Sequence, residues 1–198
     1  MADLRTPKQI FDELSSAQRR FLLEKDASGK RTATAWLEFL KPIVAFDILV
    51  DNSSKKLRHA LRLLAFMAAF NLLVALIIGN GWVGATGGLM AFLAAYQWSK
   101  LRANVKRDLH NHLRDYFVPL LSYMVEGDFG EMVVEAKFQL REKDQRQYVI
   151  EGSIGEEVGG IRFAITRDSY TVDFGVKHVE GKLGKANQLV GDVMQFLS

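Results

Sequence analysis

The sequence contains one group of side chains whose types and spacing resemble a metal site. Asp108, His112 and Asp115 stand four and three residues apart, so they share a face if this stretch is helical. His110 lies two residues from His112 and points elsewhere. Two carboxylates and one imidazole are too few ligands for a closed metal site. We therefore expect a solvated helix face with a weak Asp–His pair, and neither a metal nor a cofactor.

No other motif predicts catalysis. The glycine-rich stretch 152–160 lacks the Lys-Ser/Thr pair of a phosphate-binding loop, and Glu156 and Glu157 at its centre would repel phosphate. We expect it to be a flexible connection between strands, with a mobile rim that contacts a partner as the alternative. His178 has only Glu180 as a carboxylate at an informative spacing, and there is no nucleophile elbow and no HExxH. The sequence has no cysteine, so cysteine chemistry is excluded, and we expect a protein that is not an enzyme.

The feature that must organise the rest of the chain is an uncharged stretch from Leu63 to Ser99. As one straight helix it would be about 55 Å long, far more than the roughly 30 Å hydrocarbon core of a bilayer. Broken at Gly79-Asn80-Gly81, it gives two legs of about 25 Å each. We therefore expect a hairpin of two transmembrane helices. A soluble core is the alternative, but the remaining chain is too small to surround two uncharged helices.

Basic residues flank this stretch on both sides, and the turn between the legs carries no charge. By the positive-inside rule both ends of the hairpin then lie in the cytoplasm. Basic side chains attract anionic lipid headgroups by about 1 kcal/mol each, and aromatic side chains suit the interface. The expected membrane and lipid contacts are Lys55, Lys56, Arg58, Arg62, Trp82, Trp98, Lys100, Arg102, Lys106 and Arg107. Because the basic residues that explain the net charge of +3 lie here, we expect no nucleic-acid partner.

Small residues predict how the two legs pack. Ala68, Asn71 and Ala75 fall on one face of the first leg. The second leg has a small-residue ridge that lets a helix approach closely, formed by Gly84, Gly88, Ala91 and Ala95. We expect these two faces to pair, with Asn71 facing protein because an unpaired amide in hydrocarbon is costly. A pore would need several copies of the hairpin, and few other polar residues are available to line it.

The N-terminal region predicts helices without a membrane span. Thr6, Pro7 and Gln9 form a capping-box start for a helix that reaches about Lys25, followed by a loop over residues 26–30. This helix either packs on the protein's own cytoplasmic domain or docks a partner. Residues 32–50 are apolar but too interrupted to span, and Pro42 should end or kink a helix there. An interfacial helix and burial against the cytoplasmic domain both remain open for this segment, and residues 52–54 suit the cap of the helix entering the membrane.

The C-terminal part changes from helical to strand periodicity. Apolar residues from Leu101 to Leu121 recur about every four positions, which predicts one long stalk helix with Pro119 near its end. After residues 127–130 the period is two, in four runs near 131–141, 148–154, 161–165 and 170–176. These predict a four-stranded antiparallel meander, with a further short strand near Val179 or Leu183 left open. An amphipathic helix over 185–197 would cover its apolar face.

Together these expectations describe a transmembrane helical hairpin joined to a small cytoplasmic α+β domain. We divide the chain into an N-terminal helical region (1–54), the hairpin with its basic flanks (55–107), a stalk (108–127) and a ββββα domain (128–198). The expected function is a non-catalytic anchoring, scaffolding or regulatory subunit in the bacterial inner membrane, with both termini cytoplasmic. Its partners would be anionic lipids and other membrane or cytoplasmic proteins, or further copies of the chain. An oligomeric pore and a lipid- or ligand-sensing domain are the alternatives.

Overall fold

The computed structural model describes residues 6–107, 109, 111–139, 149–155, 160–183 and 186–197. The chain divides into two compact units. The hairpin unit comprises Met1–Lys8 and Asp47–Asp108, and the α+β unit comprises Gln9–Phe46 and Leu109–Ser198. The stretches assigned from the sequence to an N-terminal region and to a stalk therefore both contribute to the unit that contains the sheet.

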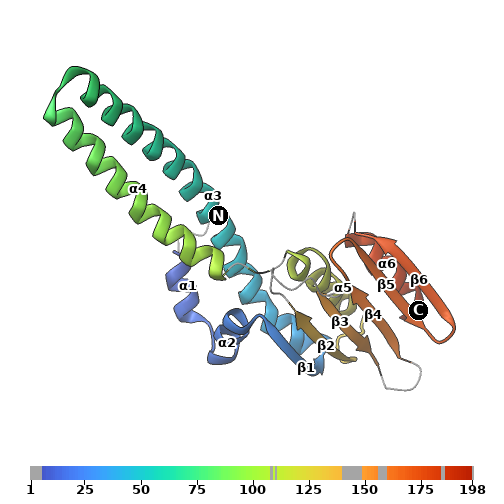
Figure 1. The fold of residues 1–198 in the computed structure, drawn as a ribbon. Coiled ribbons are helices and arrows are strands. Elements are labelled where there is room, and N and C mark those ends of the chain that lie inside the picture. The colour runs from blue at the N-terminus through green and yellow to red at the C-terminus, as the bar shows by residue number, and fades with distance from the viewer. Residues whose placement is uncertain are drawn as a thin grey trace. The chain divides into compact units, whose positions relative to one another are not determined.

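The hairpin unit is built from helix α4 (Gly81–Arg107) and from the part of helix α3 (Ala33–Ile78) that follows Phe46, and these lie side by side (Figure 1). The chain reverses at Gly79, whose φ of 72° is a left-handed conformation that glycine adopts without strain. Asn80 then caps α4, because its Oδ1 accepts a hydrogen bond of 3.0 Å from the backbone N–H of Trp82. The break seen in the sequence thus produces a tight turn between two helices.

Helix α3 is longer than expected. It runs through Pro42 without ending, so residues 52–54 do not cap a new helix. Proline removes the N–H that would bond to the carbonyl four residues earlier, which normally weakens a helix. Here Leu40 and Ile43 on either side are completely buried, and this burial stabilises the helix through the lost bond.

The expected helix over residues 6–25 is two helices, α1 (Pro7–Glu13) and α2 (Ser16–Glu24). A capping box that the sequence analysis did not predict lies at the start of α2. Ser15 Oγ accepts from the N–H of Gln18, and Gln18 Oε1 accepts from the N–H of Ser15. This reciprocal pair starts a new helix, which is why one apolar stripe is divided between two.

The sheet of the α+β unit has six antiparallel strands in sequential order, and not the four expected. Four of them match the predicted runs, and residues 177–182 form a further strand that the sequence left open. The residues expected to form a loop after α2 pair instead with Val133–Gln139, more than a hundred positions along the chain. The strands are β1 (Asp26–Thr32), β2 (Val133–Gln139), β3 (Ile150–Ile154), β4 (Ile161–Ile165), β5 (Ser169–Phe174) and β6 (Lys177–Lys182).

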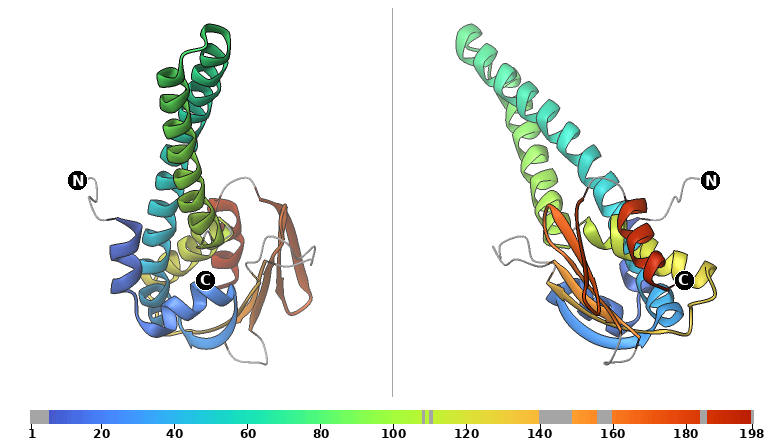
Figure 2. Two further views of the ribbon diagram at one scale, coloured as in Figure 1. Left: turned by 60° about the vertical axis from the view of Figure 1, so that its left-hand side comes forward. Right: turned by 90° about the vertical axis from the view of Figure 1, so that its right-hand side faces the viewer.

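In the part of the chain that the structure describes, helices cover one face of this sheet (Figure 2). Figure 2 shows α5 (Val118–Glu126) and α6 (Ala186–Leu197) together against it, as expected for the C-terminal helix. The ring of Phe138 in β2 lies 5.3 Å from Phe21, 5.4 Å from Trp36 and 5.3 Å from Phe117. Residues of α2 and of the start of α3 are therefore buried in this core, which is the second of the two interpretations that the sequence left open for residues 32–50.

No continuous stalk helix leads from the hairpin. Helix α4 ends at Arg107, and a π-helix, η1 (Leu113–Phe117), precedes α5. Pro119 stands in the first turn of α5, directly after η1, and the backbone N–H of Val118 donates to the Leu113 carbonyl five residues earlier, so the helix passes this proline through a π-type turn. Phe117, Leu120 and Leu121 are completely buried, so the periodic apolar residues of this stretch serve the core of the α+β unit.

Candidate membrane-spanning hairpin and open sheet face

Among the described residues, α3 is the one helix long and apolar enough to cross a membrane by length and composition. Only 6% of its most apolar window is buried within the protein. Helix α4 does not meet the same test, because glycine, threonine and glutamine take the place of larger apolar residues along it. Evidence for a second span therefore comes from the exposed and buried side chains of both helices.

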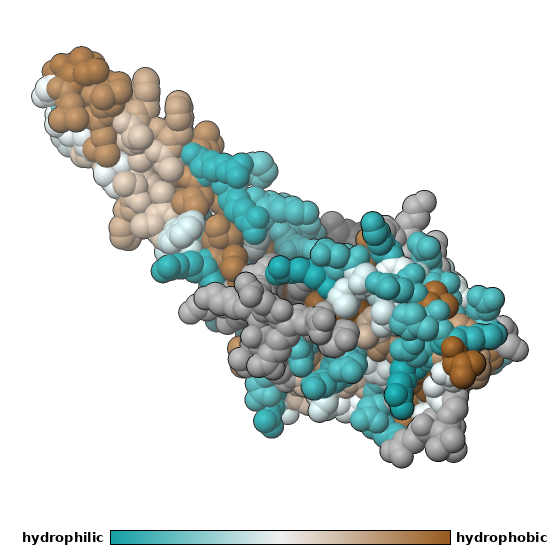
Figure 3. All heavy atoms as spheres, turned by 45° about the vertical axis from the view of Figure 1, so that its right-hand side comes forward, coloured by the Kyte–Doolittle hydropathy of each residue, from teal (hydrophilic) through white to brown (hydrophobic). Residues whose placement is uncertain are grey.

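Large apolar side chains cover the outside of the hairpin. Leu76 is 83% exposed, Trp82 84% and Phe92 70%. Figure 3 shows this surface in brown towards the α3–α4 turn, with hydrophilic side chains beginning farther along the helices. Soluble monomers rarely expose so large an apolar surface, since each such side chain loses about 1.5–3 kcal/mol by staying in water. Exposure of this surface to water is therefore unfavourable.

The two helices meet along a seam whose residues alternate at spacings of three and four. On α3 the seam residues are Ser54, Leu57, Leu61, Leu64, Ala68, Asn71 and Ala75, and on α4 they are Gly84, Gly87, Met90, Ala94, Gln97, Leu101 and Asn104. Asn71 Nδ2 lies 3.4 Å from Met90 Sδ, a weak hydrogen bond. A Cβ on Gly87 would lie 3.0 Å from the side chain of Leu72. This is the spacing of an antiparallel coiled coil.

The seam differs from the small-residue ridge expected from the sequence. Asn71 and Gly84 lie in it, whereas Gly88, Ala91 and Ala95 are exposed. A Cβ added at Gly88 would meet nothing within 4 Å. The expected ridge also steps by four and three residues, so spacing alone did not distinguish it from the face one position earlier, which the structure buries. Gly87 and Ala94 therefore occupy the positions expected for Gly88 and Ala95.

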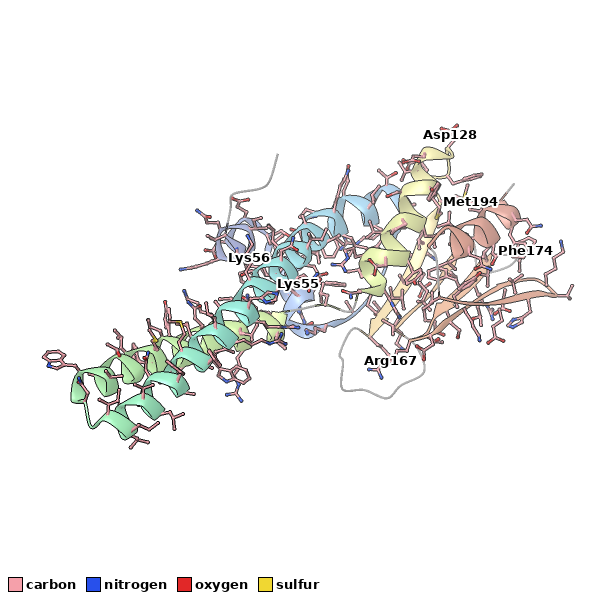
Figure 4. All side chains as sticks on the ribbon, turned by 90° about the horizontal axis from the view of Figure 1, so that it is seen from above. Lys55, Lys56, Asp128, Arg167, Phe174 and Met194 are labelled. Atoms are coloured by element: carbon pink, nitrogen blue, oxygen red, sulfur yellow. The ribbon has the colours of Figure 1, made fainter. Side chains whose placement is uncertain are left out.

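Basic side chains surround the open end of the hairpin. Lys55 and Lys56 project from α3 (Figure 4), and Arg58, Arg62, Lys100 and Arg102 are also exposed. No acidic residue occurs between Asp51 and Asp108. Two aromatic rings form cation–π contacts with basic side chains four residues later in α4. Lys100 Nζ lies 4.4 Å from the centre of the Tyr96 ring, and Arg102 Cζ lies 6.0 Å from the centre of the Trp98 ring. The side chains of Lys106 and Arg107 lie outside the described part of the chain.

Trp82 and Trp98 lie near opposite ends of the uncharged part of α4. Sixteen residues separate them, which is about 24 Å along a helix. Both side chains are exposed. Tryptophan is enriched at both interfaces of a bilayer, because its ring is apolar and its N–H needs a polar partner. The spacing therefore suits two interfacial belts.

The α+β unit offers a second surface, the uncovered face of its sheet. A concavity of about 800 Å³ lies over β1 to β5. Opposite charges are register neighbours across it, with Lys30 beside Glu135, Lys137 beside Glu151, and Arg162 beside Asp173. Such cross-strand pairs contribute about 0.2–1 kcal/mol each to the sheet. Because the charges alternate and balance, this face suits a protein or peptide of matching pattern better than a phosphate.

The residues that resembled a metal site do not form one within the described part of the chain. His112 Nε2 lies 2.9 Å from the carbonyl oxygen of Arg167, and Asp115 accepts a hydrogen bond from Arg114 Nε. Burial lowers the pKa of His112, against the opposing effects of the Arg167 carbonyl and of Asp115. Asp108 lies outside the described residues, as does the centre of the glycine-rich stretch, residues 156–159.

Two features of these surfaces were not recognised from the sequence. The seam is visible as alternating steps of three and four from Leu57 to Ala75, a signal that a search for small residues overlooks. His178 pairs with Asp173, a carboxylate that its sequence spacing did not single out, since its Nδ1 lies 2.5 Å from Asp173 Oδ1 on the neighbouring strand. The contact between His178 and Asp173 depends on the register of two strands, which the residue spacing within one strand does not reveal.

Comparison of the chain with family models, with curated proteins and with solved structures finds no match. The hairpin and the open sheet face are therefore the two surfaces that indicate a function. The hairpin supplies an apolar surface with a basic end, and the sheet supplies a polar concave surface.

Proposed function

We propose that the protein is an integral protein of the bacterial inner membrane whose α3–α4 hairpin spans the bilayer. It acts as a non-catalytic anchoring, scaffolding or regulatory subunit that holds the α+β unit on the cytoplasmic side. The observation that carries this proposal is the hairpin's exposed apolar surface, which ends in a zone with basic side chains and no acidic ones. Such a surface is stable in lipid and unstable in water.

The length of the hairpin supports this proposal. The uncharged part of α3 before the turn, residues 63–78, is about 24 Å long, and the uncharged part of α4, residues 82–99, is about 27 Å long. Both are close to the roughly 30 Å of a hydrocarbon core. Basic residues on both helices at the open end support a cytoplasmic location of that end by the positive-inside rule.

The polar side chains of the hairpin favour an anchor over a pore. Asn71 and Gln97 lie in the seam, and Thr86 Oγ1 donates to the carbonyl of Val83 in its own helix at 2.8 Å. A pore-lining helix would direct such groups along one outward face. The outward faces of this pair are apolar, as a lipid-facing surface requires.

The topology can be tested by single-cysteine labelling, because the sequence contains no cysteine. Gly81→Cys places a thiol at the turn, where a side chain meets nothing within 4 Å, and Val176→Cys places one at a fully exposed position of the α+β unit. In cells with a permeabilised outer membrane, a membrane-impermeant maleimide should label Gly81→Cys. Val176→Cys should react only after the inner membrane is lysed. Equal labelling of both before lysis, or release of the protein by alkaline extraction, would refute the membrane topology.

A scaffolding role predicts that the open sheet face binds a partner. Glu135→Lys with Arg162→Glu reverses two charges on this face and leaves the net charge unchanged. A matched control reverses the exposed i,i+4 pair on α2, Arg20→Glu with Glu24→Lys. After mild detergent extraction, partners recovered with the wild type and the control should be lost from the sheet variant. Recovery of nothing with the wild type, or of the same proteins with both variants, would count against a scaffold that uses this face.

A further inference from the structure

Four side chains at the open end of the hairpin share one flank. Arg58 and Arg62 each directly follow a seam residue of α3, and Trp98 and Arg102 each directly follow a seam residue of α4. One step along a helix turns the side chain by about 100°. In an antiparallel pair, forward turns from the facing seams of both helices lead to the same side. Lys56 and Lys100 each precede a seam residue, so they lie on the opposite flank.

The register of the seam places these side chains at matching heights. Ala75 packs beside Gly84, and Asn104 Nδ2 lies 3.4 Å from Ser53 Oγ, so paired residues have numbers that sum to about 157–161. Arg58 is therefore level with Arg102, and Arg62 is level with Trp98. The guanidinium of Arg102 extends back over the Trp98 ring, towards the level of Arg62. Three guanidinium groups and one indole gather where the uncharged stretch begins.

This cluster has no anionic counterpart in the described chain. None of the three arginines forms an ion pair with a described residue. The nearest acidic residue along α3 is Asp51, seven positions before Arg58 or about 10 Å along the axis. The three arginine side chains carry like charges and repel one another, and an anion bound among them would relieve this repulsion. Arginine suits phosphate in particular, because its planar group donates two parallel hydrogen bonds.

We propose that Arg58, Arg62, Trp98 and Arg102 form a binding site for the headgroup of an anionic phospholipid in the cytoplasmic leaflet. This inference rests on the proposed membrane insertion. The occupant is a lipid and not a free phosphate, because the same flank continues towards the turn as an apolar surface that includes Gly88, Ala91 and Ala95. The headgroup phosphate binds the arginines, Trp98 lies at the interface, and the acyl chains follow the exposed flank of α4.

The chain offers a matched pair of variants for a test. Arg58→Gln with Arg102→Gln removes one charge from each helix on the proposed flank. Lys56→Gln with Lys100→Gln removes one charge from each helix at nearly the same heights on the opposite flank. In lipid nanodiscs or by native mass spectrometry of the full chain, the wild type should bind phosphatidylglycerol in preference to phosphatidylcholine. The arginine variant should bind phosphatidylglycerol at least roughly tenfold more weakly than the lysine variant, because both lose the diffuse attraction of two charges and only the arginine variant loses hydrogen bonds to the phosphate.

Three outcomes would overturn the proposal. The first is equal weakening of phosphatidylglycerol binding in both variants, which would indicate diffuse electrostatic attraction. The second is no lipid preference in the wild type. The third is displacement of the lipid by inorganic phosphate at equal concentration. Cysteine labelling at the turn, repeated on each variant, separates this failure from failure of the proposed function. A hairpin that inserts normally but shows no preference refutes the lipid site alone, whereas a hairpin that does not insert refutes the proposed function.

Discussion

The ring of Tyr170 fills the space that a side chain at Gly181 would need in the core of the α+β unit. Gly181 on the edge strand β6 faces the Tyr170 ring of β5, and a Cβ at Gly181 would overlap the ring. The Tyr170 hydroxyl donates a hydrogen bond of 2.5 Å to Asp192 Oδ2 on α6. Burial and this bond raise the pKa of Tyr170, so the hydroxyl stays protonated at neutral pH. The ring thus joins the last two strands to the C-terminal helix.

Gly181→Ala should destabilise the α+β unit by about 1–3 kcal/mol, because the ring must move to admit a methyl group. Gly191→Ala is its control, since that position lies on α6 and a Cβ there meets nothing within 4 Å. The control should raise the free energy of unfolding by about 0.4–1 kcal/mol through its higher helix propensity. Denaturant unfolding monitored by circular dichroism measures both. A neutral Gly181→Ala would show that the ring is not held over the strand.

His112 predicts a pH dependence of stability. Its pKa is lower in the folded chain than the ordinary value of about 6.5, so the unfolded state binds the proton more readily. The stabilisation is present above about pH 6.5 and is lost as the pH falls through the folded value. His112→Gln should therefore lose less stability than the wild type between about pH 7.5 and 5.5, above the range where most carboxylates titrate. Thermal unfolding across this range tests it, and identical pH profiles would exclude the effect.

At the scale of elements, the alternating seam determines how α3 and α4 pair. Gly87→Leu places a large side chain against Leu72 and should destabilise the hairpin by about 1–3 kcal/mol. Gly88→Leu is the matched control, one residue along and outside the seam, and should leave the hairpin intact. Crosslinking yield between cysteines placed at Ala75 and Gly84 reports the pairing. Loss of crosslinking in the Gly88 variant and not in the Gly87 variant would restore the ridge inferred from the sequence.

The elements were recognisable from the sequence to different degrees. The strands β2 to β5 alternate apolar and polar residues, and that local signal survives folding because their inner face is the core. Strand β1 has no such alternation, since Gly29 and Arg31 take its inner positions. A Cβ at Gly29 would lie 3.4 Å from the Trp36 ring, and Arg31 Cζ lies 5.0 Å from the centre of that ring. The strand that pairs with β1 lies more than a hundred positions along the chain, so no local pattern predicts β1.

At the scale of the whole molecule, the α+β unit takes residues from both sides of the hairpin. Replacing residues 47–108 by a flexible glycine-serine linker of about twenty residues should therefore give a soluble, cooperatively folded protein. Residues 128–198 alone should not fold, because they lack β1, α5 and the rings of Phe21, Trp36 and Phe117. Solubility and a cooperative thermal transition distinguish the two chains. A stably folded 128–198 fragment would show that the N-terminal segments are dispensable.

The sequence by itself determined the uncharged hairpin, its turn, its basic ends and the alternating strands. These features follow from local composition and from periods of 3.6 and 2, which a single segment displays without its neighbours. The tertiary structure decided which residues form the seam, that residues 26–32 are a strand, and that the stretch before α5 belongs to the sheet's core. Each of these depends on contacts between residues far apart in sequence, where packing outweighs local propensity. The free flank of basic residues belongs to the second group, because only the seam shows which sides of α3 and α4 lie together.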